Sequence, residues 1–349
     1  MSDDFTNVEL AQATRNHGMP LEALRYDLTP PGLHYLLIHY DIPPVDPNFT
    51  LTVDGAVEEP GSWTLEDLRA MRSATVPVTL ECAGNGRTLY ERRSESQPWI
   101  REAVGTAEWT GVPVAELLRR TRLRDDAVDV VFTGSDRGLE GGEEQWYARS
   151  LPPAELQREE VLLAYEMNGA PLLPQHGAPL RLVVPGWYGM TAVKWLTSIT
   201  AVTEPFDGYQ QRMGYRLRAS EDDPGTPVTV IAPRALMVPP GIPAFPSRAR
   251  SLQAGPTTVH GRAWSGHAPI ERVEVSTDDG RSWTDATLDP SMGRFAWRGW
   301  HHPWDAREGS HVVCCRATDA EGNTQPDEPE WNVGGYAHNG IQRVEVQVG

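Results

Sequence analysis

The run Val78–Arg87, VTLECAGNGR, joins an apolar stretch, a cysteine and a glycine-rich turn within ten residues. The first part is rich in β-branched residues and predicts a strand. The following AGNG sequence at Ala83–Gly86 predicts a tight turn whose small residues let a ligand approach the backbone. The Cys82 thiol is therefore expected where a strand ends. It is either a small core residue, as many cysteines are, or a thiolate that binds a metal beside the cation of Arg87.

The chain has 31 lysine and arginine residues, and Lys194 is the only lysine among them. A composition this biased indicates that arginine has replaced lysine wherever either side chain serves. The remaining lysine either persists by chance or marks a position that requires a compact ammonium group. We favour the second interpretation because Lys194 lies in a stretch with several other candidate residues.

The first 225 residues predict a mixed domain of helices and strands, preceded by an irregular, proline-containing arm at 1–32. A capped helix is expected to begin at Thr64, because the carboxylate of Asp67 can reach back to it. The helical and strand patterns do not alternate regularly, so we expect an α+β layer arrangement and not a doubly wound sheet. The other elements expected here are strands at 51–55, 76–82, 128–132 and 180–185 and a helix at 111–118.

Residues 226–349 predict a separate all-β domain. Proline is frequent after residue 225 and no helical period remains. Val273 and Val275 alternate with polar residues, and a turn follows at Asp278–Gly280, as in short strands joined by tight turns. Cys314 and Cys315 are neighbours on another such strand and are expected to be small core residues facing opposite sides. These features predict an immunoglobulin-like sandwich.

Composition argues against several classes of partner. The formal net charge of -17 leaves no basic stripe for nucleic acid. No apolar run approaches the ~20 residues of a membrane span. The N-terminal residues lack an export signal, so a cytoplasmic protein is expected. The three cysteines form no Cys-x-x-Cys zinc motif and no Cys-x-x-Cys-His haem motif.

Three blocks of the sequence resemble the sulfite oxidase family, molybdenum enzymes in which a cysteine binds the metal beside the dithiolene of molybdopterin. Val78–Arg87 resembles the metal-binding segment of that family. Leu162–Leu172 and Gln175–Gly186, followed by Val193–Leu196, resemble its pterin-binding core. The resemblance runs from about residue 33 to the end, and residues 226–349 resemble the family's immunoglobulin-like dimerisation domain.

The resemblance implies a role for each matching residue. Cys82 would be the protein ligand of molybdenum. A phosphate dianion suits one planar guanidinium and one compact ammonium, which would give the lone lysine a function. Each residue also has a structural alternative, such as a core histidine or a turn-forming aspartate. The residues expected to contact molybdopterin are His39, Asp136, Ser150, His176, Arg181 and Lys194.

The same comparison implies a substrate pocket. Tyr215 resembles the active-site tyrosine of the family, and Arg87 resembles a pocket arginine. Arg298 resembles an arginine that the second domain extends into this pocket, although it could instead stack on Trp297 at the surface. Cations are expected there because a small anion loses its water on binding and needs charged hydrogen-bond donors.

One departure from the family pattern concerns the substrate. Where the family carries an Arg-Asn-His run, the chain has Leu37–His39. A literal Arg-Asn-His run occurs at Arg15–His17, but the proline spacing and Asp46 align His39 with the family histidine. We therefore interpret Arg15–His17 as unrelated to the site. A missing cation is expected to weaken binding of a dianion by about 1.5–3 kcal/mol, so sulfite is expected to be a poor substrate.

The resemblance implies a molybdopterin-dependent oxidoreductase that oxidises sulfite to sulfate, or a related small oxyanion, by oxygen-atom transfer. Two alternatives stay open: an enzyme acting on a less charged sulfur or nitrogen oxide, possibly as a reductase, and a cofactor-binding protein without turnover. No haem module is visible in this chain, so an outside acceptor, a cytochrome or dioxygen, is expected to take the electrons. A homodimer is expected through the second domain.

Overall fold

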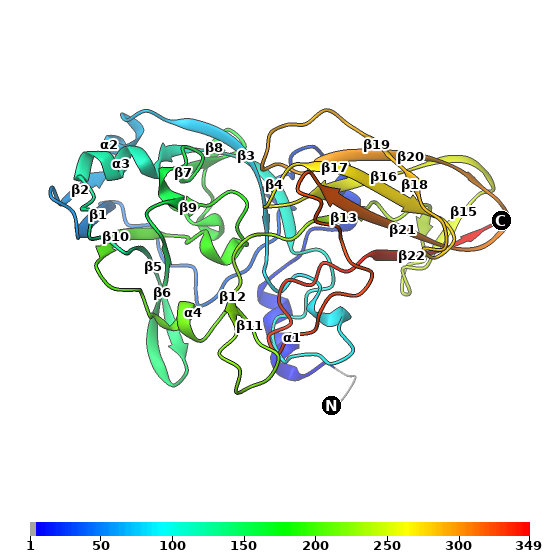
Figure 1. Ribbon diagram of the computed structural model, residues 1–349, viewed down its shortest axis with the longest axis horizontal. Helices are drawn as coiled ribbons and strands as arrows, with labels where there is room; N and C mark the ends of the chain where they lie inside the picture. Colours follow the sequence, from blue (N-terminus) through cyan, green and yellow to red (C-terminus); the bar gives the residue numbers. More distant parts are fainter. Residues whose placement is uncertain (1–4) are drawn as a thin grey trace.

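The computed structural model describes residues 5–349, in which a mixed domain and a β-sandwich lie side by side (Figure 1). The predicted α+β domain followed by an all-β sandwich is confirmed. The first four residues of the predicted arm lie outside the described residues. The predicted boundary at residue 225 falls between the paired strands β11 (Arg216–Leu217) and β12 (Thr226–Pro227), and it stays a prediction.

Two sheets form the first domain. One contains, in spatial order, β2 (Gly61–Thr64), β1 (Thr50–Gly55), β10 (Leu196–Val202), β5 (Asp129–Glu140) and β6 (Glu143–Leu151). The other contains β3 (Ala74–Glu81), β4 (Val104–Pro113), β7 (Leu162–Met167) and β8 (Ala170–Pro171), with β9 (Arg181–Val183) also pairing with β7. Only β1 and β10 pair in parallel among these strands.

The helices are short and lie outside the sheets. The predicted cap at Thr64 is confirmed, because its side chain accepts from the Asp67 N–H while the Asp67 carboxylate accepts from the Thr64 N–H. None of the described helices is long and apolar enough to cross a membrane. The α-helices are α1 (Asn7–Arg15), α2 (Leu65–Arg69), α3 (Val114–Thr121) and α4 (Tyr209–Arg212), and the 3₁₀ turns are η1 (Leu21–Arg25), η2 (Arg87–Leu89), η3 (Glu155–Gln157), η4 (Pro174–His176) and η5 (Gly189–Thr191).

The arm is not irregular throughout, which corrects the sequence analysis. Its first described element is the helix α1, whose start is fixed by a capping box between Thr6 and Glu9. Apolar periodicity could not reveal this helix, because only Glu9 is buried along it. The capping box was the one local signal, and the sequence analysis did not use it.

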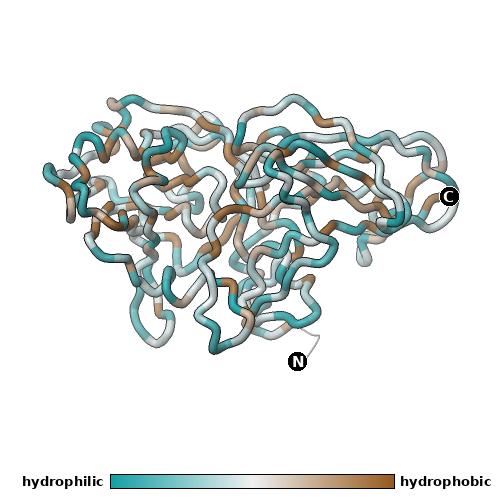
Figure 2. The backbone as a smooth tube through the Cα atoms, in the orientation of Figure 1, coloured by the Kyte–Doolittle hydropathy of each residue, from teal (hydrophilic) through white to brown (hydrophobic). Residues whose placement is uncertain are grey.

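The second domain is a two-layer sandwich. One layer contains β13 (Arg234–Met237), β16 (Gly255–Trp264), β20 (Arg298–Ala306) and β19 (Thr287–Leu288). The other contains β14 (Ile242–Pro243), β15 (Arg250–Leu252), β22 (Gln342–Val348), β21 (Gly309–Asp319), β17 (Ile270–Ser276) and β18 (Thr284–Asp285). Cys314 and Cys315 are both fully buried and unpaired, as predicted. The hydrophobic segments of both domains run through their interiors, and hydrophilic segments form many of the outer loops (Figure 2).

Strand β3 lies where the two domains meet (Figure 1). The Thr79 N–H donates to the Phe295 carbonyl at 2.8 Å, and the Trp297 N–H donates to the Thr79 hydroxyl at 2.7 Å. A buried ion pair joins Glu81, at the end of β3, to Arg234 of the sandwich at 2.6 Å. The indole N–H of Trp264 donates to the same carboxylate at 2.8 Å. The second domain thereby holds the residue that directly precedes Cys82.

Replacing Arg234 by Ala is expected to lower the free energy of unfolding by about 3–5 kcal/mol, because it leaves the buried Glu81 carboxylate without its cation. Urea unfolding of purified wild type and variant measures this loss. Arg272→Ala is the matched control, because its side chain is 53% exposed and pairs within the sandwich only. The control is expected to cost less than about 1 kcal/mol. Equal losses in the two variants would contradict a special role for the Glu81 pair.

Candidate functional site

Two adjoining cavities meet at Cys82. The inner cavity lies between the two sheets of the first domain, and the residues that matter most in its lining are His34, Asp136, His176, Arg181 and Lys194. The outer cavity has a volume of about 320 Å³ and opens beside the arm and the sandwich. His39, Cys82 and Tyr215 line both cavities. Most of the residues predicted from the sequence are therefore brought together around one sulfur atom.

The turn after β3 fixes the position of Cys82. Gly86 has a φ of +98°, and a Cβ there would lie 2.7 Å from the His338 ring, so only glycine fits. Asn85 holds the turn from inside, because its amide donates to the Glu81 carboxylate at 2.9 Å and accepts from the Ala103 N–H at 3.1 Å. The predicted AGNG turn is confirmed, and it places the thiol at the end of the strand.

The surroundings of Cys82 do not by themselves make a thiolate, which corrects the sequence analysis. The side chain is 7% exposed and packs against Trp99 and Ala103. Burial raises the pKa of the Cys82 thiol, and the nearby charge of Arg87 only partly offsets this effect. A metal bound to the sulfur would supply the missing positive charge and remove the proton.

Two cations, the buried Arg181 and the half-buried Lys194, line the inner cavity without forming an ion pair within the described residues. The Arg181 guanidinium donates only to the backbone carbonyls of His176 and Ala192, at 3.0 and 3.2 Å, and its Nε atom has no partner in the described chain. The Lys194 ammonium donates to the Leu37 carbonyl at 2.6 Å. Neither residue takes part in any of the ion pairs formed within residues 5–349. A buried charge without a counter-charge is costly, so this arrangement indicates an anionic ligand.

The charge states of the inner cavity follow from burial. Burial and then the charge of Arg181 lower the pKa of Lys194 to about 7. Burial raises the pKa of Asp136 to about 6, against the attraction of Lys194. Burial lowers the pKa of His34 to about 3 and that of His176 to about 4, so both rings are neutral at pH 7. At pH 7 the cavity thus offers the Arg181 cation, a partly protonated Lys194, a largely ionised Asp136 and two neutral imidazoles.

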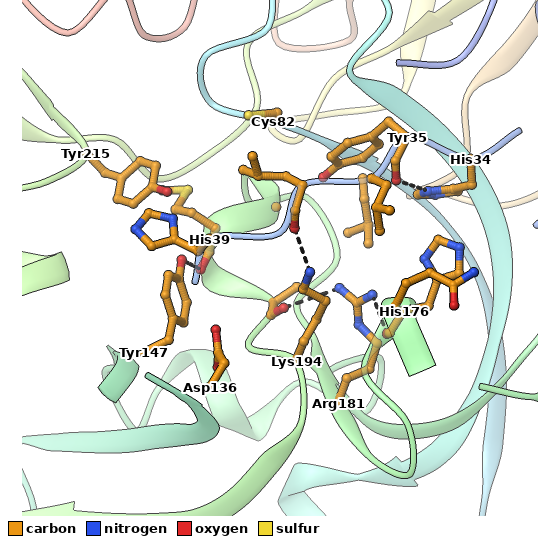
Figure 3. A pocket seen from close by; sticks show the side chains of 17 residues that line it. His34, Tyr35, His39, Cys82, Asp136, Tyr147, His176, Arg181, Lys194 and Tyr215 are labelled. Carbon is orange, nitrogen blue, oxygen red and sulfur yellow. Dashed lines mark hydrogen bonds between the residues drawn. The ribbon is translucent and has the colours of Figure 1, made fainter. Parts of the chain in front are cut away.

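Figure 3 shows how these groups face one another. Lys194 and Arg181 point toward the middle of the inner cavity, and Cys82 lies on the opposite side. His34 and His176 lie at one end of the cavity, with ring centroids 5.7 Å apart. His39, Asp136, Tyr147 and Tyr215 lie at the other end. An elongated ligand with an anionic group near the cations could therefore reach the sulfur.

Tyr215 is held in a strained backbone conformation at the border of the two cavities. Its φ of +53° is unusual for a bulky residue, and such strain is found most often at functional sites. The ring is buried and lies 5.3 Å from that of Tyr336, which comes from the second domain. Arg87 places its guanidinium over the same Tyr336 ring, at 5.2 Å. Arg87 and Tyr215 thus meet in the outer cavity, as expected.

Two predicted residues lie outside both cavities. The Arg298 guanidinium donates to the backbone carbonyls of Asp289 and Ile270, at 2.9 and 3.1 Å, so the sandwich itself holds it. In this structure Arg298 therefore does not reach the cavities, its predicted role in the substrate pocket stays a prediction, and the second domain contributes Tyr336 to the outer cavity. Ser150 is buried but lines neither cavity, and its hydroxyl accepts from the Gln211 amide at 2.8 Å.

The Arg15–His17 run was wrongly interpreted as unrelated to the site. Arg15 lines the outer cavity, and the Asn16 side chain accepts from the Ile38 N–H at 2.6 Å. His17 pairs with Leu36 through its backbone, while His39 lines the cavities, as expected from the alignment. The sequence analysis also missed Glu140 and Trp99, which carried no motif. The literal Arg-Asn-His sequence was a usable signal for Arg15.

The comparisons with known proteins agree with this geometry. Residues 39–210 match the family model "Oxidoreductase molybdopterin binding domain", and residues 245–349 match "Mo-co oxidoreductase dimerisation domain". Mitochondrial sulfite oxidase of Rattus norvegicus is 35% identical over 344 residues, which cover 92% of this chain and 62% of the rat protein. The chain belongs to the sulfite oxidase family. It spans less than two thirds of the length of these curated relatives.

Two further relatives show the breadth of the sulfite oxidase family. Nitrate reductase [NAD(P)H] of Hordeum vulgare is 32% identical over 351 residues, which cover 92% of this chain and 39% of that protein. The solved structure of the sulfane dehydrogenase SoxCD from Paracoccus pantotrophus has a TM-score of 0.83 at 27% identity, over 95% of this chain and 84% of that chain. The fold is therefore shared with proteins named for different substrates.

The inner cavity fits the cofactor of the sulfite oxidase family, molybdenum bound by molybdopterin. The phosphate of that cofactor needs cations, and Arg181 and Lys194 line the cavity without forming an ion pair in the described chain. Its pterin ring needs hydrogen-bond partners, and unpartnered polar atoms remain on Asp136 and His34. Its metal needs one protein sulfur, which Cys82 supplies. Within residues 5–349 no group of three His, Cys, Asp or Glu residues forms another metal set.

The lone lysine predicts a pH dependence of the cofactor-free protein. The pKa of Lys194 is about 7 in the folded chain, against 10.5 for an ordinary lysine, so the unfolded chain binds more protons between these pH values. The free energy of unfolding is therefore expected to gain a contribution from Lys194 that rises with pH from about 7 to about 10. Lys194→Met removes this contribution.

Urea unfolding of cofactor-free wild type and Lys194→Met, measured from pH 6.5 to 10, tests this prediction. The variant is expected to be the more stable protein at pH 7, and its advantage is expected to shrink as the pH rises. Parallel pH curves for the two proteins would show that burying the Lys194 ammonium does not lower the free energy of unfolding.

Proposed function

We propose that this protein catalyses the oxidation of a small sulfur anion by adding an oxygen atom and removing two electrons, with sulfite as the reference substrate. The observation that carries the proposal is the sharing of Cys82 by the two cavities. One cavity has the buried cations for an anionic cofactor, and the other has Arg87 for an anionic substrate. The similarity to rat sulfite oxidase and to a sulfane dehydrogenase supports a sulfur substrate.

The protein's own residues are proposed to bind and orient the cofactor and the substrate. Arg181 and Lys194 would bind the cofactor phosphate, and Cys82, which lines both cavities, would bind the metal. Arg87 binds the substrate anion, and its stacking on Tyr336 holds the guanidinium in place. The Tyr215 hydroxyl is expected to orient the substrate, and burial keeps this hydroxyl protonated by raising its pKa well above 10. The cofactor supplies the two-electron redox chemistry.

Reduction of a nitrogen oxide is the second candidate. The similarity to the Hordeum vulgare nitrate reductase supports it, since that relative matches 92% of this chain. The two candidates are distinguished by the direction of electron flow. Sulfite with ferricyanide tests oxidation, and nitrate with reduced methyl viologen tests reduction. A rate with nitrate and none with sulfite would reject our first proposal.

Three further properties belong to the proposal. The match of residues 245–349 to a dimerisation domain supports a homodimer, which sedimentation of the full chain tests. The electrons are proposed to pass to an outside acceptor, either a cytochrome or dioxygen, and oxygen consumption during turnover separates these two. The cytoplasm is proposed as the compartment, on the basis of three cysteines that are all free, and cell fractionation tests it.

Replacing Cys82 by Ser is expected to give a folded protein that has lost nearly all sulfite–ferricyanide activity, because a hydroxyl does not replace a thiolate as a metal ligand. Molybdenum and pterin are measured on the same preparations as the rates. The unfolding free energy of Cys82→Ser is expected to stay close to that of wild type, since the two side chains are similar in size.

Cys314→Ser is the matched control, because Cys314 is also buried but lies in the sandwich, away from both cavities. The control is expected to keep its metal and its activity. Wild-type turnover by Cys82→Ser, with molybdenum present, would rule out Cys82 as the metal ligand. A wild-type preparation without molybdenum and pterin would reject the proposed function as a whole.

A further inference from the structure

The charges lining the outer cavity do not suit a dianion. Two arginines of the first domain, Arg15 from the arm and Arg87 from the turn after β3, line it, and one carboxylate, Glu140, also lines it. Glu140 lies at the end of β5 and its side chain is 32% exposed. The permanent charges of the wall therefore leave one net positive charge for the substrate, and His39, which lies 3.2 Å from Glu140, adds a second charge only when its ring is protonated. This count depends on Glu140, which no sequence motif indicated.

Glu140 is built into the wall and cannot swing away freely. Its Oε2 atom accepts from the Tyr40 hydroxyl at 2.8 Å, and the His39 ring lies 3.2 Å from the same oxygen. The Gln210 amide also donates to this oxygen. Burial alone would raise the pKa of the Glu140 carboxyl. The hydrogen bond and charge of His39 outweigh this effect, together with the hydrogen bonds from Tyr40 and Gln210, so the pKa of Glu140 is lowered. The carboxylate is thus ionised at neutral pH and held in place.

Arg15 is also fixed by the fold. Its guanidinium donates to the Tyr40 carbonyl, so it lies on the same side of the cavity as Glu140. The next residue, Asn16, ties the arm to the cavity wall by accepting from the Ile38 N–H and donating to the Gln97 side chain, at 2.6 and 2.8 Å. The arm therefore supplies a cation close to Leu37, the residue that stands where the family pattern has an arginine.

Apolar surface lies beside the sulfur. Trp99 packs directly on Cys82, and Leu37 packs against the same cluster. Leu139 lines the outer cavity next to Glu140, and its side chain is 82% exposed. A bare oxyanion leaves such surfaces in contact with water, whereas a substrate with an apolar group would cover them. The cavity volume of about 320 Å³ is in the range of sites that bind organic molecules.

We propose that the outer cavity selects a singly charged sulfur anion that carries an apolar group, an organic sulfinate, and that Glu140 is the residue that rejects the second charge of sulfite. This inference rests on the proposed function and names its substrate class. The reaction is R–SO₂⁻ + H₂O → R–SO₃⁻ + 2 H⁺ + 2 e⁻. A new S–O bond forms with an oxygen from water, the two protons go to solvent, and two equivalents of a one-electron acceptor take the electrons.

The experiment compares benzenesulfinate with sulfite as substrates of the molybdenum-loaded protein, with ferricyanide as acceptor and enzyme-free rates subtracted. Wild type is expected to have a kcat/KM for benzenesulfinate about tenfold or more above that for sulfite. Glu140→Gln is expected to raise kcat/KM for sulfite about tenfold and to change that for benzenesulfinate less than about threefold. The variant keeps an oxygen that can accept from Tyr40 and Gln210, so it is expected to fold.

Glu144→Gln is the matched control, because Glu144 lies on the neighbouring strand, pairs with Arg137 at 2.7 Å and does not line the cavity. It removes the same charge and is expected to leave both kcat/KM values unchanged. Titration calorimetry with the two products gives a readout without turnover. Glu140→Gln is expected to bind sulfate about tenfold more tightly than wild type does, with little change for benzenesulfonate.

The outcomes distinguish failure of this inference from failure of the proposed function. A preference for sulfite in wild type, with no effect of Glu140→Gln on sulfite or sulfate, would overturn the inference and leave the proposed function standing. Equal gains in Glu140→Gln and Glu144→Gln would also overturn it, since a general charge effect would explain both. A loaded protein that neither turns over nor binds any of these anions would reject both proposals.

Discussion

Two basic side chains that form no ion pair in the described chain, the buried Arg181 and the half-buried Lys194, are the constraint on which the site depends. A folded chain normally pairs such groups, because an isolated buried charge is unfavourable by several kcal/mol. Here, among the residues that the structure describes, both cations donate only to backbone carbonyls. The protein is therefore complementary to an anion that it does not itself supply. The phosphate of molybdopterin would meet this requirement, and it would give a function to the single lysine of the chain.

The second constraint is the position of one sulfur atom. Cys82 lies at the end of β3, and the turn that follows allows only glycine at Gly86. Directly before it, the Glu81 carboxylate is held by Arg234 and Trp264 of the sandwich. The second domain thus fixes the proposed metal ligand through its neighbour in sequence. It also adds Tyr336 to the outer cavity, so the two domains build the site together.

Local patterns predicted much of the fold, and the resemblance to the sulfite oxidase family indicated most of the inner cavity. Strand β3, its turn and the capped helix α2 follow from short-range signals, and the sequence blocks around Arg181 and Lys194 marked the cation pair. Contacts between segments far apart in sequence could not be predicted in the same way. Arg298 binds backbone carbonyls of its own domain, Arg15 reaches the site through a helix without an apolar face, and Glu140 is placed by the pairing of β5 and β6. Each depends on tertiary packing that no local pattern carries.

The most direct test of the account is a crystal structure of the purified protein with diffraction data on both sides of the molybdenum absorption edge. The account predicts an anomalous peak at bonding distance from the Cys82 sulfur and density for a phosphate group against Arg181 and Lys194. A Cys82 side chain in contact only with Trp99 and Ala103, with no anomalous peak and no ligand beside the two cations, would contradict it.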